Sequence, residues 1–235
     1  MKATHQLRQR AQRTPLLTTV VLLLLYLVPA IIFVALAKEV GEGEIFFFDR
    51  PVMDYIHSLA SPGLTVFFQI VTEFGGTIIL PVVTCLVSVW LYFGLRRRKM
   101  GLFLFSSVGG AAVLNLVLKS IFQRTRPDFW QHLVQEHGYS FPSGHAMGSA
   151  ALAVCVVVMC WRSRWRWVAV GVGTLYMVLV GLSRIYLGVH YPSDIVAGWC
   201  MSVVWVLLLA GVLYEYMTYF AYRHSKNHKG RRRHG

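Results

Sequence analysis

Six polar residues at the edges of apolar segments have the side chains needed to handle a phosphate group. They comprise three cations, two histidines and one carboxylate, namely Lys119, Arg126, Arg184, His145, His190 and Asp194. Three fixed positive charges suit a tetrahedral dianion, because arginine and lysine form charge-assisted hydrogen bonds to oxyanions. Two histidines suit a nucleophile and a general acid. The residue types therefore favour phosphoryl chemistry.

The pair His190 and Asp194 is the most specific part of this set. The two residues lie four positions apart, across Pro192, where the last apolar segment begins. An aspartate close to a histidine holds one ring nitrogen as N–H, which leaves the other nitrogen free to attack. Histidine has an unperturbed pKa of about 6.5, so it is available as a neutral nucleophile at ordinary pH. Asp194 also suits a helix N-terminus, where the dipole favours a carboxylate, and both roles are compatible.

The run Pro142-Ser143-Gly144-His145 directly precedes another apolar segment, so we expect it to form a helix N-terminus. Such a terminus binds anions through its free N–H groups and its positive dipole end. Ser143 is expected either to cap the helix or to bond a phosphate oxygen. Gly144 lets the backbone approach an anion closely. We expect His145, in the first turn, to point at that anion.

Lys119 and Arg126 lie seven residues apart, close to two helical turns. They would share one face if their helix continued outward, and Pro127 is expected to end that helix. Lys119 alone also fits an ordinary side chain snorkelling at a helix end. Arg124, between them, is expected at the surface or at a lipid headgroup.

The composition places these residues in a membrane protein. The chain has 235 residues, of which 56% are hydrophobic and 14% charged, unlike an ordinary soluble domain. A spanning helix needs about 20 mostly apolar residues. Six segments are expected to span, at 16–37, 77–95, 102–118, 145–161, 167–182 and 195–214. We therefore expect residues 1–235 to form one all-α domain, an integral-membrane six-helix bundle.

The segment 38–76, between the first two spans, is expected to contain two short interfacial helices. Asp49 is expected to cap the first, with Pro51 in its first turn. Its apolar face would comprise Val52, Tyr55, Ile56 and Leu59. Pro62 is expected to open the second, whose apolar residues are Leu64, Phe67, Phe68 and Val71.

The net charge of +13 is concentrated in four basic clusters. These lie at 1–15, 96–99, 162–166 and 223–235, and all fall on one side if six helices alternate. Cytoplasmic loops carry the Lys/Arg excess, so we expect both termini and their basic tails in the cytoplasm. The segments that carry the six polar residues are then expected on the opposite, non-cytoplasmic side. Anionic lipids explain the basic tails better than nucleic acid does. The first apolar run exceeds the roughly 7–15 residues of a signal peptide, so we expect it to be retained.

We expect neither a metal nor another cofactor. The four cysteines lie in apolar spans and suit buried thiols rather than metal ligands or a disulfide framework; they are Cys85, Cys155, Cys160 and Cys200. His132, Glu136 and His137 form a small cluster, but in a loop expected to be exposed.

Taken in order, the segments K-x6-RP, PSGH and SR-x5-H-x3-D resemble the three-part signature of the type 2 phosphatidic acid phosphatase superfamily. The chain is similar to bacterial membrane members of that family. The resemblance implies that His190 forms a phosphohistidine, that Asp194 orients it, and that His145 protonates the leaving group and then activates water. It also implies metal-independent binding of the phosphoryl oxygens by Lys119, Arg126, Arg184, Ser143 and backbone N–H groups around Gly144.

The expected function is dephosphorylation of a membrane lipid at the non-cytoplasmic face of a bacterial cell membrane. Candidate substrates are undecaprenyl pyrophosphate, phosphatidylglycerophosphate, phosphatidic acid and a phosphorylated lipid A, and the pattern does not choose among them or fix an oligomeric state. A lipid-to-lipid phosphotransferase would share the first step. A transporter is disfavoured because the spans lack charges along their length. The vanadium haloperoxidase branch shares the signature in soluble proteins, which six spans disfavour.

Overall fold

The computed structural model describes residues 2–231, and all regular structure in that range is helical. Met1 and residues 232–235, the end of the expected basic tail 223–235, lie outside the described residues. The elements are α1 (Lys2–Gly41), α2 (Asp49–Ser58), α3 (Pro62–Glu73), α4 (Ile79–Val89), the π-helical turn η1 (Trp90–Gly94), α5 (Arg98–Phe122), α6 (Gly144–Cys160), α7 (Arg166–Tyr186) and α8 (Pro192–Arg231). The predicted all-α class is confirmed for this range.

Four of these helices are long and apolar enough to cross a membrane. The spans are Leu23–Gly41 within α1, Arg98–Phe122, Arg166–Tyr186 and Pro192–Leu213. The continuous segment Ile79–Gly94 and helix α6 are apolar but shorter. The chain is therefore a multi-pass membrane protein, and the count of six spans stays a prediction.

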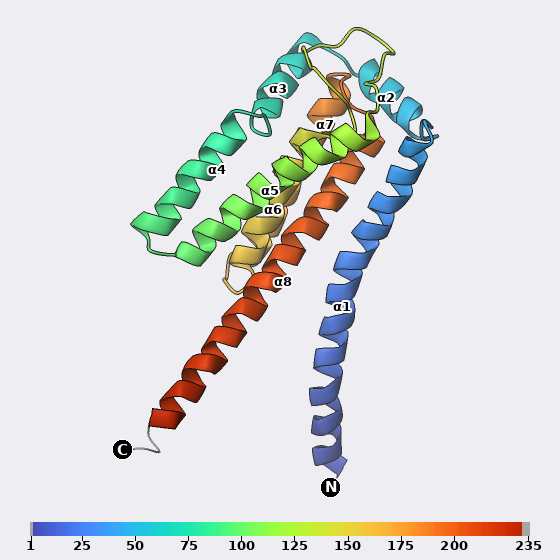
Figure 1. The fold of residues 1–235 in the computed structure, drawn as a ribbon. Coiled ribbons are helices and arrows are strands. Elements are labelled where there is room, and N and C mark those ends of the chain that lie inside the picture. The colour runs from blue at the N-terminus through green and yellow to red at the C-terminus, as the bar shows by residue number, and fades with distance from the viewer. Residues whose placement is uncertain (1, 232–235) are drawn as a thin grey trace.

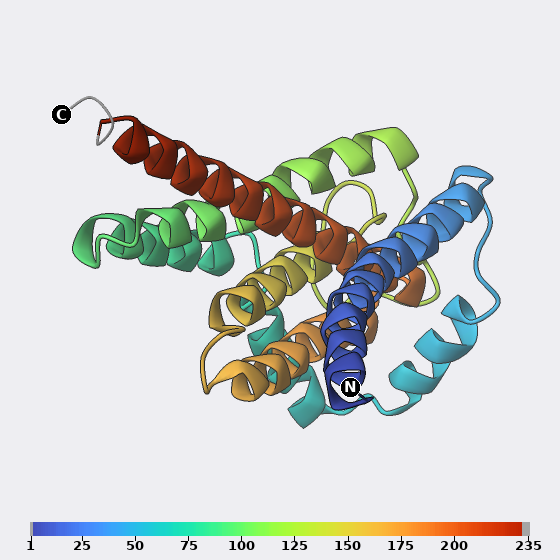
Figure 2. The ribbon, with the colours of Figure 1, turned by 90° about the horizontal axis from the view of Figure 1, so that it is seen from below.

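Helix α6 lies at the centre of the bundle. It packs against α5, α7 and α8, while α1 packs along α8. Its residues Met147, Ala151 and Cys155 are fully buried and belong to the largest apolar core. Figure 1 shows the start of α1 and the end of α8 at one end of the molecule and the connection between α5 and α6 at the other. Figure 2, seen from below, shows α1 and α8 in front of the other helices.

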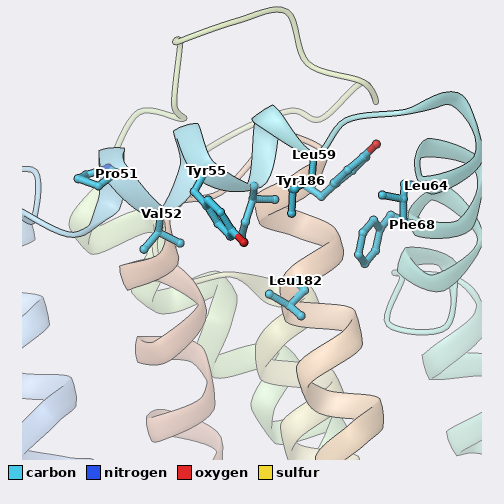
Figure 3. A pocket seen from close by; sticks show the side chains of 9 residues that line it. Pro51, Val52, Tyr55, Leu59, Leu64, Phe68, Leu182 and Tyr186 are labelled. Carbon is cyan, nitrogen blue, oxygen red and sulfur yellow. The ribbon is translucent and has the colours of Figure 1, made fainter.

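Helices α2 and α3 occupy the two positions predicted for short amphipathic helices. They contact α7, and with it they line an apolar pocket of about 580 Å³ (Figure 3). The four apolar residues predicted on one face of α2 all line this pocket, so that face is confirmed. The interfacial location of these helices stays a prediction.

The predicted capping role of Asp49 is wrong. The residue before α2 is Phe48, and no side chain caps the helix there. Asp49 is instead fully buried, and its carboxylate accepts hydrogen bonds from the start of α8, including 2.8 Å from the backbone N–H of Ser193. A contact between distant helices therefore replaces the local one that the sequence suggested.

Small residues allow close contacts inside the bundle. At Gly110 on α5, an added Cβ would lie 2.2 Å from the indole ring of Trp205 on α8. The Trp205 indole N–H donates to the backbone oxygens of Ser106 and Ser107 at 3.2 Å each. Neighbouring Gly109 has open space where its Cβ would be.

We predict that Gly110→Ala destabilises the bundle by about 1–3 kcal/mol, because the new methyl group must displace Trp205 from its hydrogen-bonded position. The matched change Gly109→Ala is expected to be neutral or stabilising, since alanine is the better helix former and meets no neighbour. Thermal unfolding in detergent measures both. Equal midpoints for the two variants would contradict this packing argument.

Candidate active site

The connection between α7 and α8 places His190. It is only five residues long, Leu187 to Tyr191, and its turn is closed by backbone hydrogen bonds from Leu187 to Ser183 at 2.9 Å and from Val189 to Arg184 at 3.2 Å. Gly188 adopts a positive φ of 79°, a conformation that favours glycine. A Cβ there would also lie 2.7 Å from the Trp130 indole nitrogen. The short turn therefore holds His190 rigidly between two helix ends.

The neighbours of His190 determine which ring nitrogen carries the proton. Nδ1 lies 3.2 Å from Oδ2 of Asp194, and Nε2 lies 3.3 Å from Nη1 of Arg126. A guanidinium only donates hydrogen bonds, so Nε2 must be the acceptor and carry the lone pair. The carboxylate accepts the proton on Nδ1. The unprotonated Nε2 therefore faces the cations.

The electrostatic surroundings keep this imidazole neutral. His190 is 1% exposed. Burial lowers the pKa of His190 well below its usual value, and the positive charges of Arg184, Arg126 and Lys119 lower that pKa further. Because the shift is downward, the neutral form persists as the pH falls past 6.5, the usual histidine value.

Asp194 contacts both the start of α8 and the ring of His190. It is the third residue of α8, and its Oδ2 accepts the backbone N–H of Tyr191 at 3.0 Å, just before the helix. This is the reach of a capping residue back across the first turn. The same oxygen faces Nδ1 of His190. One side chain therefore ties the helix start to the histidine.

The three predicted phosphate ligands lie near His190, although Lys119 and Arg126 do not share a helical face. Helix α5 ends at Phe122, where Gln123 adopts a left-handed φ of 46°, so Arg126 lies in the following loop. The Arg126 guanidinium donates to the backbone oxygens of Val189 at 2.9 Å and Gly138 at 3.1 Å. The condition for a shared helical face is therefore not met, because α5 ends at Phe122 and not at Pro127 as predicted.

Arg184 and Lys119 complete the group of cations. Arg184 is 1% exposed and its Nη1 donates to Oγ1 of Thr72 on α3 at 2.7 Å. Its buried Nε–H has no acceptor among the described residues. Lys119 Nζ donates to the backbone oxygen of Tyr139.

The loop between α5 and α6 supplies a carboxylate to these cations. Glu136 forms an ion pair with Nη2 of Arg126 at 3.4 Å and another with Nη2 of Arg184. Sequence reasoning placed Glu136 in an exposed cluster with two histidines, whereas its side chain is 24% exposed and bridges two arginines. Its carboxylate thus occupies a position between two candidate phosphate ligands.

The Pro142–His145 turn joins the same site. Ser143 caps α6, as one of its two predicted roles requires, with Oγ accepting the Ala146 N–H at 3.4 Å. The Ser143 N–H donates to the backbone oxygen of Asp194 at 3.2 Å, which ties this turn to α8. Asn115 on α5 donates to the Pro142 oxygen at 2.9 Å, and a Cβ on Gly144 would lie 2.9 Å from its Oδ1. His145 stands half-buried in the first turn of α6.

Sequence reasoning missed the burial of Arg124. The expected surface or headgroup position is wrong, because this side chain is only 8% exposed and pairs with Asp49 and Asp194. Charged side chains are almost never fully buried unless paired, so two buried aspartates required a cation. That requirement becomes visible only once the burial of Asp49 is known.

The residues described in the structure contain no group of three His, Cys, Asp or Glu side chains placed to hold a metal ion. His132, from the cluster noted in the sequence, instead makes a 2.7 Å contact between Nε2 and the Pro127 oxygen.

Comparison with known proteins identifies relatives of this chain. The chain is 31% identical over 198 residues to the undecaprenyl-diphosphatase of Sulfolobus acidocaldarius, covering 81% of this chain and 88% of that protein. It is 28% identical over 184 residues to phosphatidylglycerophosphatase B of Bacillus subtilis, covering 76% and 90%. The crystal structure of a transmembrane PAP2-type phosphatidylglycerolphosphate phosphatase from Bacillus subtilis matches with a TM-score of 0.74 and 26% identity, over 82% of this chain and 97% of that one.

An all-helical membrane bundle carrying a buried histidine–aspartate pair beside clustered cations defines a membrane phosphatase, and its relatives are named as phosphatases of lipid phosphates. Residues 100–218 match the family model of the PAP2 superfamily, and the chain belongs to that superfamily. The predicted family and enzyme class are confirmed.

We predict that Glu136→Gln tightens inhibition by orthovanadate about tenfold, equivalent to about 1.4 kcal/mol. The carboxylate neutralises Arg126 and Arg184, so an anion must compete with it. The inhibition constant in detergent measures the effect. Asp128→Asn is the matched control, because it removes an exposed carboxylate from the same loop. The same inhibition constant in both variants would show that Glu136 does not compete with the anion.

Proposed function

We propose that this chain removes phosphate from a membrane lipid phosphate or pyrophosphate through a phosphohistidine on Nε2 of His190. The observation that carries the proposal is the orientation of that ring. Asp194 accepts from Nδ1, and Arg126 donates toward Nε2. The lone pair of a neutral imidazole thus points at the cations that would hold the phosphoryl group.

In the first step, Nε2 forms a bond to phosphorus while the bond from phosphorus to the leaving oxygen breaks. His145, starting as an imidazolium, gives a proton to that oxygen and becomes neutral, and the oxygen departs as an alcohol or as a lipid phosphate. Asp194 stabilises the positive charge that develops on His190. In the second step, His145 takes a proton from water as its oxygen attacks phosphorus, and the bond to Nε2 breaks. Inorganic phosphate leaves and both histidines return to their starting states.

Side chains supply the charge that the phosphoryl oxygens require. Lys119, Arg126 and Arg184 would bind these oxygens. The buried Nε–H of Arg184, which has no acceptor among the described residues, supports this role because a buried donor without an acceptor is costly. Ser143 and the N–H groups around Gly144 would add donors at the start of α6. The incoming dianion would displace Glu136 from the two arginines. No metal ion is needed in this scheme, because fixed cations stabilise the transferring group.

The substrate candidates follow from the names of the relatives and from the membrane setting. Undecaprenyl pyrophosphate and phosphatidylglycerophosphate come first, since the relatives are named for these activities, and phosphatidic acid is the third. The test is phosphate release from a panel of these lipids in detergent, with excess chelator. Activity that depends on added magnesium would contradict the metal-free scheme. Transfer of label to a second lipid instead of water would identify a phosphotransferase.

We predict that His190→Ala lowers kcat at least about a thousandfold, because no other group takes over nucleophilic attack. His145→Ala is expected to accumulate a phosphoenzyme from a substrate with a good leaving group, since water is then poorly activated. Rapid-quench labelling should give acid-labile, base-stable label in His145→Ala and none in His190→Asn. Label in the His190 variant would assign the nucleophile elsewhere.

We also infer that residues 1–235 form one domain, with the site on the non-cytoplasmic face of a bacterial cell membrane and both termini in the cytoplasm. The basic connections at 95–97 and 161–165 lie toward the end opposite the α5–α6 loop (Figure 1). The Lys/Arg excess of cytoplasmic loops supports this orientation.

We predict that a cysteine replacing Gln135 reacts with an impermeant thiol reagent on spheroplasts, whereas one replacing Arg98 does not react until the membrane is permeabilised. Both positions are exposed, at opposite ends of α5 and its connections. The unsubstituted chain provides the baseline for its four native cysteines. The reverse labelling pattern would place the site in the cytoplasm.

A further inference from the structure

Arg124 lies behind the candidate nucleophile, on the side away from the phosphate ligands. Its Nη1 donates to Oδ1 of Asp194 at 2.6 Å and to Oγ of Ser193 at 2.8 Å. Its Nη2 donates to Oδ2 of Asp49 at 3.0 Å. The flat face of its guanidinium stacks on Tyr191, with 4.0 Å between its carbon and the ring centroid. Both arms and one face of Arg124 are therefore occupied by protein.

Asp49 closes this cluster from a different helix. Its Oδ1 accepts the Ser193 N–H at 2.8 Å, and its Oδ2 accepts the Ser193 hydroxyl at 2.7 Å. Asp49 is the first residue of α2, and Ser193 is the second residue of α8. A carboxylate near free N–H groups at a helix start is stabilised by the helix dipole. Asp49 therefore anchors α2 to the start of the helix that carries Asp194.

The charges in this cluster depend on one another. Asp49 and Asp194 are each 0% exposed, and Arg124 is the cation that contacts both of them in the described structure. A buried carboxylate without a cation tends to take up a proton instead of remaining charged. Removing one member of a buried ion pair leaves its partner as an uncompensated charge.

We propose that Arg124 is a positioning residue that acts on His190 through Asp194, and that Asp49 holds Arg124 in place from α2. Arg124 keeps Asp194 as an acceptor for the Nδ1 proton of His190. If Asp194 were protonated, it would donate to Nδ1, and the imidazole proton would move to Nε2. The nucleophilic lone pair would then be lost from the atom that faces the phosphate ligands. Neither the family resemblance nor the six residues singled out for phosphate chemistry assigns such a role to Arg124 or Asp49.

Two features separate Arg124 from the phosphate ligands. Its contacts are to Asp194, Ser193 and Asp49, on the Nδ1 side of the histidine. The Nε2 side of the His190 ring faces Arg126 instead. Loss of Arg124 should therefore lower the rate of chemistry and leave anion binding intact.

The test rests on the proposed function and uses a double-mutant cycle between Arg124→Gln and Asp194→Asn in the full-length protein. Each single variant is expected to lower kcat at least about a hundredfold with a phosphate ester substrate, as loss of a histidine-orienting carboxylate does in other enzymes. The double variant should be within about threefold of Asp194→Asn alone, because both changes disable the same step. The vanadate inhibition constant of Arg124→Gln should stay within about threefold of the unsubstituted value.

Two further variants keep the test decisive if Arg124→Gln folds poorly. Arg124→Lys retains the charge but cannot donate to Asp194 and Asp49 through a rigid fork, so its kcat should lie between those of the unsubstituted chain and Arg124→Gln. Asp49→Asn should lower kcat about tenfold or more with unchanged vanadate inhibition. Its matched control is Asp54→Asn, which removes a half-exposed carboxylate from the same helix and should leave kcat unchanged.

Three outcomes would overturn this role. Multiplicative effects in the double variant would show that Arg124 does not act through Asp194. A weakened vanadate affinity in Arg124→Gln that matches its loss of kcat would make Arg124 a phosphate ligand. Full activity in Arg124→Lys and Asp49→Asn would remove the positioning role. An unsubstituted chain with no phosphatase activity would instead refute the proposed function itself.

Discussion

The cost of burying charge organises the outer end of this bundle. Asp49, Asp194 and Arg184 are each no more than 1% exposed, in a chain that is otherwise mostly apolar. An ion left unpaired in such surroundings costs several kcal/mol. Each charge therefore needs a partner, and the partners come from elements far apart in the sequence. Pairing these charges joins α2, the α5–α6 loop, the end of α7 and the start of α8 into one unit.

The paired charges form two clusters of opposite character, and His190 lies between them. The cluster of Asp49, Arg124 and Asp194 carries an excess of negative charge and faces Nδ1. The cations Lys119, Arg126 and Arg184 face the other side, and Glu136 forms ion pairs with two of them there. An imidazole in this position has one stable neutral tautomer, with its lone pair directed at the cations. The polarity of the surroundings thus sets the direction in which the histidine can react.

The α5–α6 loop covers the cations through its backbone as well as through Glu136. Arg126 donates to the carbonyls of His137 and Gly138, and Lys119 donates to that of Tyr139. Together with Glu136, these three residues form a run of four that contacts the cations that a phosphate group would otherwise engage. Backbone carbonyls carry no net charge, so a dianion meets its main competition from the single carboxylate. The loop therefore keeps the cations ordered without neutralising all of their charge.

The sequence by itself determined the properties that depend on local spacing and composition. The length of the apolar segments identified the helical membrane scaffold, and the four-residue step from His190 to Asp194 placed both side chains at one helix start.

The tertiary structure decided the partners of the buried charges. Asp49 was expected to cap its own helix, yet it bonds Ser193, which lies 144 residues away. Arg124 was expected at the surface, yet it pairs with Asp49 and Asp194, 75 and 70 residues away. Glu136 was expected to be exposed, yet it bridges two arginines. Spacing cannot predict such pairs, because which charges become buried together depends on how the helices pack.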